Sequence, residues 1–480
     1  MSIKAQALSG VFWSSLQQFS TQIIGFVVSL VLARLLLPAE FGLLAIVGIF
    51  VSIGSVLVDS GLSQSIIRTI NPTQEDFSTI FFFNLAGSLF IYLLIFFIAP
   101  VIADFYHHDI LTSLIRCYCI VFIINAFSNI QYTRLTKKMD FKTELKIAIP
   151  SLIISSIVGV SMAFLGYGVW SLVCSAIVQS LVNSMQIWFW SKWRPSFIFN
   201  KNLFKNHFEY GYKLTLSSIL EIIFSNIYVI IIGRLFAPAQ LGFYNRADSL
   251  KQFPVANISV IINKITFPLF AKIQNDDVQL KNIYKKIMQM VIFIVAPTLI
   301  FMAVLGEPLF RFLFTEKWLP AVPYFQILCF NGILYPIHSY NLNILKVKGR
   351  SDLFLKLEIV KKIVLFFIVA IAFQFGIYGL LISSVIFSII AFFINTFYTN
   401  KFIKYSALQQ ILDLLPIIFL AFFSGFIMFG MYYYLKEKIY SDLIILLICS
   451  IFGSALYLYL SYFLKIKSIF ELLDIIKRKQ

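Results

Sequence analysis

Long apolar segments recur along the whole chain and are separated by short polar or basic connections. The clearest of them, residues 81–102, holds Asn84 as its only strongly polar side chain. Hydrophobic residues make up 60% of the 480 positions and charged residues only 13%, which is more apolar surface than a soluble protein could bury. Because a bilayer core about 30 Å thick needs roughly 20 apolar helical residues to cross it, the sequence predicts an all-α integral membrane protein.

Hydropathy predicts about fourteen transmembrane helices. The first, seventh and eighth are the least apolar, because polar side chains interrupt them. The expected ranges are 11–33, 43–66, 79–102, 110–130, 145–165, 169–190, 211–234, 241–266, 287–305, 320–342, 356–375, 379–399, 411–434 and 442–464.

The basic residues indicate how these helices are oriented. Lys and Arg number 39 against 22 Asp and Glu, and most of them lie in alternate connections and in the two tails. When both termini are placed in the cytoplasm, the connections on that side carry the excess, as the positive-inside rule requires. The net charge of +17 is therefore a topology signal, and we expect no nucleic acid among the partners.

A nine-residue motif occurs twice. Arg34–Gly42 reads RLLLPAEFG and Arg234–Gly242 reads RLFAPAQLG, so Arg, Leu, Pro, Ala and Gly recur in register. Each copy joins the first two helices of a six-helix set, which predicts two parallel six-helix lobes. An appended helix pair and a cytoplasmic amphipathic tail follow. The predicted divisions are 1–195 for the first lobe, 196–405 for the second, 406–465 for helices 13 and 14, and 466–480 for the tail.

Polar side chains form a stripe on the helix before each copy of the motif. The stripe includes Gln18 and Thr21 in the first helix and Glu221 in the seventh. Polar groups that face lipid are costly, so both stripes are expected to face protein or water. Hydrogen bonds between helices would satisfy them, but their equivalent positions favour two walls of a hydrated central cavity.

Charged residues also open the eighth predicted helix, at Arg246, Asp248 and Lys251. They are typical of a wall that receives an anionic headgroup, since Arg donates paired hydrogen bonds to phosphate. The alternative is a helix that begins outside the membrane, with side chains that snorkel to the interface. Arg34 and Arg234 are candidates for the same cavity, although the helix dipole alone favours a cation at a helix C-terminus.

Asp59 and Arg68 flank the inner end of the second predicted helix. They are expected to pair with each other or to form an inner gate. The sequence contains no GxxxxGK[ST], HExxH or GxSxG motif and no CxxC pair. It therefore indicates neither an enzyme nor an ATP-driven pump, and no metal site or other cofactor is expected.

Several motifs resemble one known family. They are the Arg-Leu-x-x-Pro-x-x-x-Gly turn at 34–42, Asp59-Ser60-Gly61-Leu62, the segment 166–173, and Tyr244-Asn245-Arg246-Ala247-Asp248. Together they resemble the polysaccharide-transport branch of the multidrug/oligosaccharidyl-lipid/polysaccharide exporter superfamily. The resemblance is greatest to lipopolysaccharide, O-antigen and colanic-acid-type flippases.

This resemblance implies a function. Members of the family move polyprenyl-diphosphate-linked oligosaccharides, such as O-antigen, exopolysaccharide or capsule units, across the bacterial inner membrane by alternating access. It implies coupling to a H⁺ or Na⁺ gradient or to the membrane potential. The expected partners are the lipid-linked substrate, membrane lipids, a glycan polymerase and glycosyltransferases. Arg246, Lys251, Arg34 and Arg234 would attract the diphosphate or acidic sugars, and Glu221 and Asp248 would balance those charges or couple to a cation.

Besides a non-transporting scaffold of a glycan-synthesis complex, two other functions remain open at this point. A cation-coupled drug antiporter of the same superfamily is one, although such proteins usually have twelve helices. A membrane glycan polymerase or ligase is the other, although such enzymes carry a large outer loop and the loops here are short.

Overall fold

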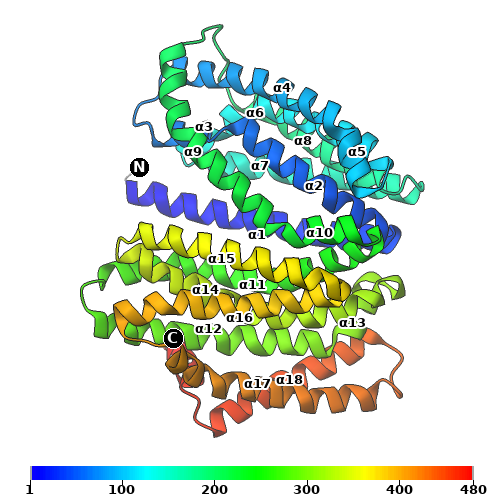
Figure 1. Cartoon of the computed structure of the whole chain (residues 1–480), viewed down its shortest axis with the longest axis vertical. Helices are drawn as coiled ribbons and strands as arrows, with labels where there is room; N and C mark the ends of the chain where they lie inside the picture. Colours follow the sequence, from blue (N-terminus) through cyan, green and yellow to red (C-terminus); the bar gives the residue numbers. More distant parts are fainter. Residues whose placement is uncertain (1–2, 478–480) are drawn as a thin grey trace. The chain divides into compact units, whose positions relative to one another are not determined.

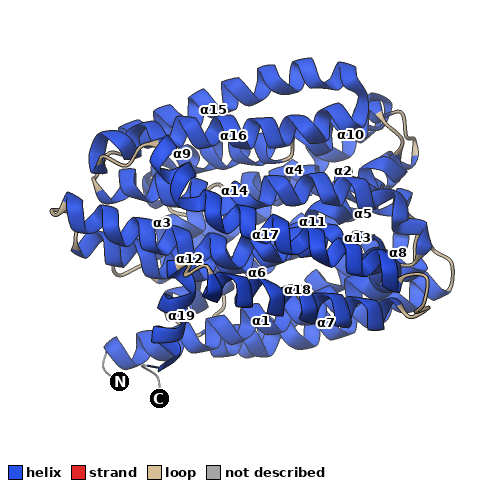
Figure 2. Cartoon of the chain, turned by 90° about the horizontal axis from the view of Figure 1, so that it is seen from below, coloured by secondary structure: helices blue, strands red, loops and turns tan. Residues whose placement is uncertain are grey.

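The computed structural model describes residues 3–477. For residues 3–8, 11, 259–265, 267, 268, 339, 351, 473 and 475–477 it describes the backbone alone. Every regular element within 3–477 is a helix, which confirms the predicted all-α class (Figure 2). Residues 1 and 2 of the first predicted lobe and 478–480 of the predicted tail lie outside the described range.

Contacts divide the chain into two compact units, Met1–Gly242 and Phe243–Gln480 (Figure 1). The first unit contains ten helices of the described range and the start of α11 (Pro238–Lys272). They are α1 (Ile3–Leu35), α2 (Pro38–Asp59), α3 (Leu62–Arg68), α4 (Gln74–Tyr106), α5 (Ile110–Tyr118), α6 (Ile120–Lys137), α7 (Phe141–Phe164), α8 (Trp170–Trp190), α9 (Lys201–Ser225) and α10 (Ile227–Leu235).

The second unit contains the rest of α11 and the helices that follow it. They are α12 (Asp277–Val304), α13 (Gly306–Phe314), η1 (Glu316–Ala321), α14 (Val322–Val347), α15 (Ser351–Ala372), η2 (Phe373–Phe375), α16 (Gly376–Ile403), α17 (Ala407–Leu435), α18 (Asp442–Phe463) and α19 (Lys467–Lys477). The boundary between the two contact units lies at residue 242, whereas the predicted boundary between the two lobes lies at 195. The predicted boundary is drawn from the sequence repeat, and it stays a prediction.

The helices are those of a membrane protein. Among the described residues, ten helical stretches are long and apolar enough to cross a bilayer, or up to eleven when the bent pair α9–α10 is included. One of the ten, Asp352–Ile403, is 52 residues long and contains both α15 and α16. That is well over the roughly 20 residues that one crossing needs. The count of fourteen stays a prediction.

Some predicted spans are broken in the structure. One continuous helix over 43–66 is wrong, because α2 ends at Asp59 and α3 begins at Leu62. Between them Ser60 and Gly61 have φ angles of 48° and 67°, a left-handed turn that ends a helix. The predicted seventh span bends by 49° where α9 meets α10.

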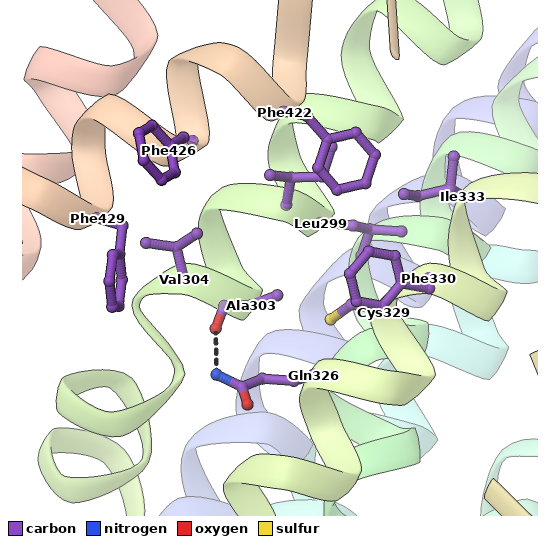
Figure 3. Close-up of a pocket in the computed structure, with 12 residues that line it drawn as sticks. Leu299, Ala303, Val304, Gln326, Cys329, Phe330, Ile333, Phe422, Phe426 and Phe429 are labelled. Atoms are coloured by element: carbon purple, nitrogen blue, oxygen red, sulfur yellow. Dashed lines mark hydrogen bonds between the residues drawn. The ribbon is translucent and has the colours of Figure 1, made fainter. Parts of the chain in front are cut away.

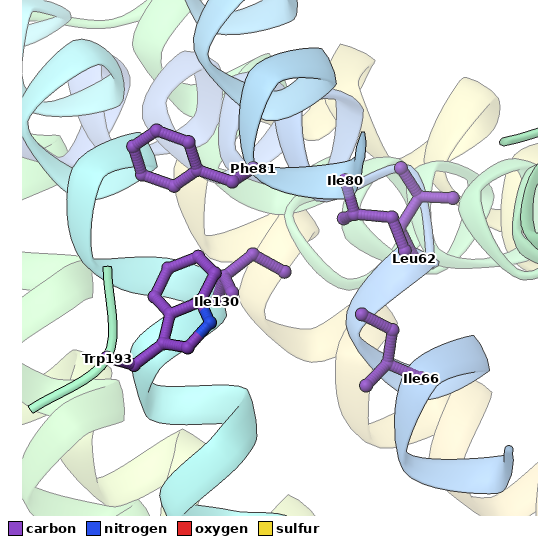
Figure 4. Close-up of a cluster of buried hydrophobic side chains, with 6 residues drawn as sticks. All are labelled: Leu62, Ile66, Ile80, Phe81, Ile130 and Trp193. Atoms are coloured by element: carbon purple, nitrogen blue, oxygen red, sulfur yellow. The ribbon is translucent and has the colours of Figure 1, made fainter. Parts of the chain in front are cut away.

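An apolar cluster packs α3, α4 and α6 of the first unit together (Figure 4). Leu62 and Ile66 of α3 pack with Ile130 of α6 and with Ile80 and Phe81 of α4. Trp193, which follows α8, completes the cluster, and its Nε1 donates a 2.6 Å hydrogen bond to Gln74 Oε1. Because α3 and α6 turn their apolar sides to this cluster, their polar sides face elsewhere.

Helices α9 and α10 run antiparallel along α2 within the first unit. Near one end, an added Cβ at Gly61 would lie 2.6 Å from the carbonyl oxygen of Gly211. Further along, an added Cβ at Gly233 would lie 3.1 Å from the side chain of Ile46. Small residues allow such close backbone approach, which is how helices associate tightly in membranes.

A buried polar network joins three helices of the second unit. Tyr284 of α12 and Thr399 of α16 both donate to Asn341 Oδ1 of α14, over 3.0 Å and 2.6 Å. All three side chains are buried, so each bond satisfies groups that water cannot reach.

Candidate functional site

Arg246 lies near the start of α11 and is held by two aromatic rings. Its guanidinium carbon is 5.1 Å from the ring centre of Phe314 and 5.3 Å from that of Trp318. Arg246 is 8% exposed and Trp318 is fully buried. A desolvated cation over an aromatic face gains about 2 kcal/mol, so the rings stabilise a charge that would otherwise be costly to bury.

Lys251 and Asp248 form an ion pair one turn further along α11. Lys251 Nζ lies 2.5 Å from Asp248 Oδ1. The lysine is 7% exposed, whereas the side chain of Asp248 is 39% exposed. An added Cβ at Gly332 of α14 would lie 3.2 Å from the lysine stem, so glycine there gives the stem room. The structure therefore brings these two predicted residues together, and Arg246 remains the one predicted cation of α11 outside the pair.

Three predicted cavity residues of the first unit have exposed side chains. They are Gln18 and Arg34 of α1 and Glu221 of α9. Their exposure is compatible with a hydrated surface, but the role in substrate binding stays a prediction.

Two further predicted residues, Thr21 and Arg234, make contacts within the first unit. The Thr21 hydroxyl donates to the carbonyl of Gln17 over 2.8 Å, one turn back on the same helix. The Arg234 guanidinium lies 5.0 Å from the ring centre of Phe105, at the end of α4. Arg234 thus packs on an aromatic ring, as Arg246 does in the second unit.

Asp59 and Arg68 lie in different surroundings. Asp59 Oδ1 accepts a hydrogen bond from the hydroxyl of Ser63, whereas the Arg68 guanidinium is 4.3 Å from the ring centre of Tyr210 on α9. No ion pair joins Asp59 to Arg68 in the described part of the chain, so the expected pairing is not observed. The alternative, an inner gate, stays a prediction.

Asp59 instead belongs to a polar pocket of about 430 Å³ within the first unit. One wall of this pocket is a stripe on α6 that includes Asn125, Asn129, Tyr132 and Thr136. The sequence prediction missed these residues. Their spacing of three to four positions is the helical repeat that would have indicated a shared face.

A buried set of hydrogen bonds was also missed. His207 of α9 has Nδ1 2.8 Å from Ser65 Oγ of α3 and Nε2 3.1 Å from Asp76 Oδ1 of α4. Because a carboxylate only accepts, Nε2 donates to Asp76, and Nδ1 bonds to the Ser65 hydroxyl, which can both donate and accept. All three side chains are buried, so the set fixes three helices together.

The second unit contains an apolar cavity of about 340 Å³ (Figure 3). It lies between α12, α14 and α17, and three phenylalanines of α17 line one side: Phe422, Phe426 and Phe429. Gln326 is its principal polar side chain, and that amide donates to the carbonyl of Ala303 over 3.0 Å. The lining suits a hydrocarbon chain.

Among the described side chains, no group of three His, Cys, Asp or Glu residues could hold a metal ion. Coupling to H⁺ or Na⁺ stays a prediction.

Known proteins resemble this chain in sequence and fold. It matches the sequence family described as "Polysaccharide biosynthesis protein" over residues 31–323. It is 28% identical over 356 residues to the teichuronic acid biosynthesis protein TuaB of Bacillus subtilis, covering 73% of each chain. It is 25% identical over 367 residues to the lipopolysaccharide biosynthesis protein WzxC of Escherichia coli, covering 75% of this chain and 74% of that one. The lipid II flippase MurJ, in an inward closed conformation, has a similar fold, with a TM-score of 0.76 at 15% identity and coverage of 95% and 99%.

The family match covers more than half of the chain. It runs from the end of α1 to the start of α14 and includes both copies of the repeated motif, the polar pocket and the charged start of α11. The resemblance expected from the motifs is confirmed. The chain belongs to the polysaccharide biosynthesis protein family.

Proposed function

We propose that this protein is a flippase that moves a polyprenyl-diphosphate-linked oligosaccharide from the cytoplasmic to the periplasmic leaflet of a bacterial inner membrane. The observation that carries the proposal is the family match, which extends over the cationic start of α11. The fold, similar to that of a lipid II flippase, supports the same class of substrate. We propose a transport mechanism by alternating access and no covalent chemistry.

The charged residues of α11 are suited to a diphosphate. Arg246 is rigidly held by Phe314 and Trp318, so little side-chain entropy is lost when it binds a phosphate oxygen. Lys251 is neutralised by Asp248 and would contribute only if a substrate displaced that carboxylate. We therefore assign the main anion contact to Arg246 and a secondary one to Lys251.

The apolar cavity between α12, α14 and α17 is suited to the other end of the substrate. Its aromatic and aliphatic lining would receive part of the isoprenoid chain, since burying each CH₂ group contributes about 0.8 kcal/mol. Both features belong to the second unit.

The membrane arrangement that we propose has fourteen crossings with both termini in the cytoplasm. Adding α11 and α14 to the ten stretches and the bent pair, and counting α15 and α16 separately, gives that number. Arg34, Arg234, Glu221, Gln18 and Thr21 are proposed to line the path, with H⁺ or Na⁺ as the coupling ion. A glycan polymerase and glycosyltransferases are the proposed partners.

A gene-deletion strain tests this function against its alternatives. We expect lipid-linked repeat units to accumulate on the cytoplasmic leaflet, inaccessible to a periplasmic glycosidase. Single units already attached to their final acceptor would instead identify a polymerase defect. Normal glycan together with increased drug sensitivity would identify a drug exporter. Either of these two outcomes overturns the flippase proposal.

A further inference from the structure

The pocket of the first unit that contains Asp59 is lined mainly by polar side chains. It is formed by the end of α2, by α3 and by the stripe on α6. Amides come from Gln64, Asn125 and Asn129, hydroxyls from Ser55 and Tyr132, and a carboxylate from Asp59. Side chains of this kind cannot face lipid without cost, so the pocket opens to water or to a polar ligand.

Apolar packing holds the helices that form the pocket in place. Helices α3 and α6 turn Leu62, Ile66 and Ile130 into the apolar cluster on the opposite side (Figure 4). Phe122 of α6 is almost fully buried and fits against Gly54 of α2, where an added Cβ would lie 2.3 Å from the ring. Phe122 is also among the residues that line the pocket. A pocket built on two packed helices holds its donors and acceptors in place.

The hydrogen-bonding capacity of the pocket is largely unused by the protein. The side-chain amides of Asn125 and Asn129 form no hydrogen bond with another residue in the described part of the chain, and neither does the Tyr132 hydroxyl. An amide offers two N–H donors and a carbonyl acceptor, and a hydroxyl both donates and accepts. The pocket therefore presents donors and acceptors together.

The charge of the pocket excludes an anion. None of the side chains that line it is cationic, and Asp59 contributes a carboxyl group. Cations of the neighbouring helices have other partners: Lys137 donates to the carbonyls of Ile66, Ile67 and Thr69, Arg134 packs on Phe77 and Trp193, and Arg68 packs on Tyr210. A phosphate or a carboxylated ligand would therefore find no cationic side chain in this pocket to pair with.

The volume of the pocket distinguishes between water, a bare cation and a neutral sugar as its ligand. A single water molecule needs only about 10–15 Å³ of such space, and a bare monovalent cation is of similar size. The pocket offers about 430 Å³, and its amide N–H groups, which are hydrogen-bond donors, cannot coordinate a cation. A neutral sugar ring fills more space, and its hydroxyls both donate and accept.

We infer that this pocket binds an uncharged sugar residue of the transported glycan, at a site separate from the proposed diphosphate contact on α11. The inference rests on the proposed function, because it takes the glycan to be the substrate. Asn125 and Asn129 supply the main hydrogen bonds, and Asp59 accepts from a sugar hydroxyl while excluding acidic sugars.

Binding of simple sugars to the purified full-length protein in lipid nanodiscs tests the inference. The probes are methyl glycosides of glucose, galactose, mannose and N-acetylglucosamine, measured by saturation-transfer difference NMR. We expect at least one of them to give a signal with the unchanged protein. The double variant Asn125→Leu/Asn129→Leu keeps the side-chain shape and should lose that signal. Tyr132→Phe removes a single hydroxyl and should lower the signal several-fold. Because this change is smaller, it serves as the test if the double variant does not fold.

The control is Asn202→Leu on the exposed first turn of α9, which should keep the full signal. Absence of signal from every glycoside, or a signal in Tyr132→Phe and in the double variant equal to that of the unchanged protein, would overturn the inference. Broadening of the ²³Na resonance that disappears in Asp59→Asn, without a glycoside signal, would overturn it in favour of a cation site. Neither result bears on the deletion-strain test, because this measurement needs no lipid carrier and no translocation.

Discussion

Gly42 and Pro238 are in direct backbone contact: a Cβ added at Gly42 would lie 1.9 Å from the carbonyl oxygen of Pro238. The contact is reciprocal, because a Cβ added at Gly242 would lie 1.9 Å from the carbonyl oxygen of Pro38. These four residues are the Pro and Gly of the two copies of the repeated motif. Each glycine therefore lets the proline carbonyl of the other copy approach closely.

The first prediction concerns this contact. Gly42→Ala should destabilise the protein by about 1–3 kcal/mol, since a backbone carbonyl cannot move aside as a flexible side chain would. Gly48→Ala, on the same helix but with nothing within 4 Å of the added Cβ, is the matched control. It should be neutral or stabilise by up to about 1 kcal/mol, because alanine favours the helix over glycine. Thermal unfolding in detergent measures both, and equal melting temperatures would contradict the contact.

The second prediction concerns the buried hydrogen bonds of His207. His207→Ala removes one of the hydrogen-bond donors of the buried Asp76 carboxylate, which typically costs about 1.5–3 kcal/mol. His207→Gln should restore part of the stability, since its amide can still donate. Lys205→Ala on the same helix is the control, because the Lys205–Glu209 pair is exposed and 4.0 Å long. A loss of stability no larger than that of the control would show that the buried set does not hold α9 in place.

The third prediction concerns pH and Glu307 on α13. Burial alone would raise the pKa of Glu307, but hydrogen bonds from Arg311 and Tyr432 lower that pKa below its usual 4.5. A lowered pKa stabilises the fold at pH values above the unfolded value and loses this effect as the pH falls through the folded value. The contribution is small, because the carboxylate is half exposed.

The unchanged protein should therefore be more stable than Glu307→Gln at pH 7, and the difference should shrink as the pH falls below about 4.5. Melting temperatures of the two proteins between pH 7 and pH 3.5 measure this. A constant difference over that range would contradict the ion pair of Glu307 with Arg311 and its hydrogen bond with Tyr432 of α17.

Sequence alone was sufficient for those features that depend on composition and local pattern. The all-α class follows from the apolar segments, and the family follows from motifs such as Asp59-Ser60-Gly61-Leu62. The charged start of α11 was found for the same reason, because Arg246, Asp248 and Lys251 stand out in an apolar chain. The 49° bend between α9 and α10 has no such signal, since no proline lies at Asn226.

Partners distant in sequence could not be predicted in this way. Asp59 was matched with Arg68 because the two are close in the chain, but Arg68 packs on Tyr210 instead. His207 acquires its role only when α9 lies beside α3 and α4, which no local pattern specifies. The stripe on α6 was in principle visible, but its amides and hydroxyls are inconspicuous beside charged residues.

The fourth prediction concerns Arg246, the proposed contact with the substrate diphosphate. Removing its charge should slow translocation at least tenfold, because a charge-assisted contact to phosphate contributes about 1.5–3 kcal/mol. Arg246→Lys keeps the charge but not the planar fork that packs on Phe314 and Trp318, so it should recover only part of the rate. Arg350→Gln is the control, since Arg350 is exposed and its guanidinium donates to nearby Asp352.

The most direct measurement reconstitutes the protein in vesicles with a polyprenyl-diphosphate-linked oligosaccharide in the inner leaflet. Its appearance in the outer leaflet is followed with a glycosidase that cannot cross the membrane. We predict rapid exposure of the glycan with the unchanged protein and with Arg350→Gln, and exposure at least tenfold slower with Arg246→Gln at equal protein content. Equal rates for Arg246→Gln and the unchanged protein, or no exposure above protein-free vesicles, would contradict the account.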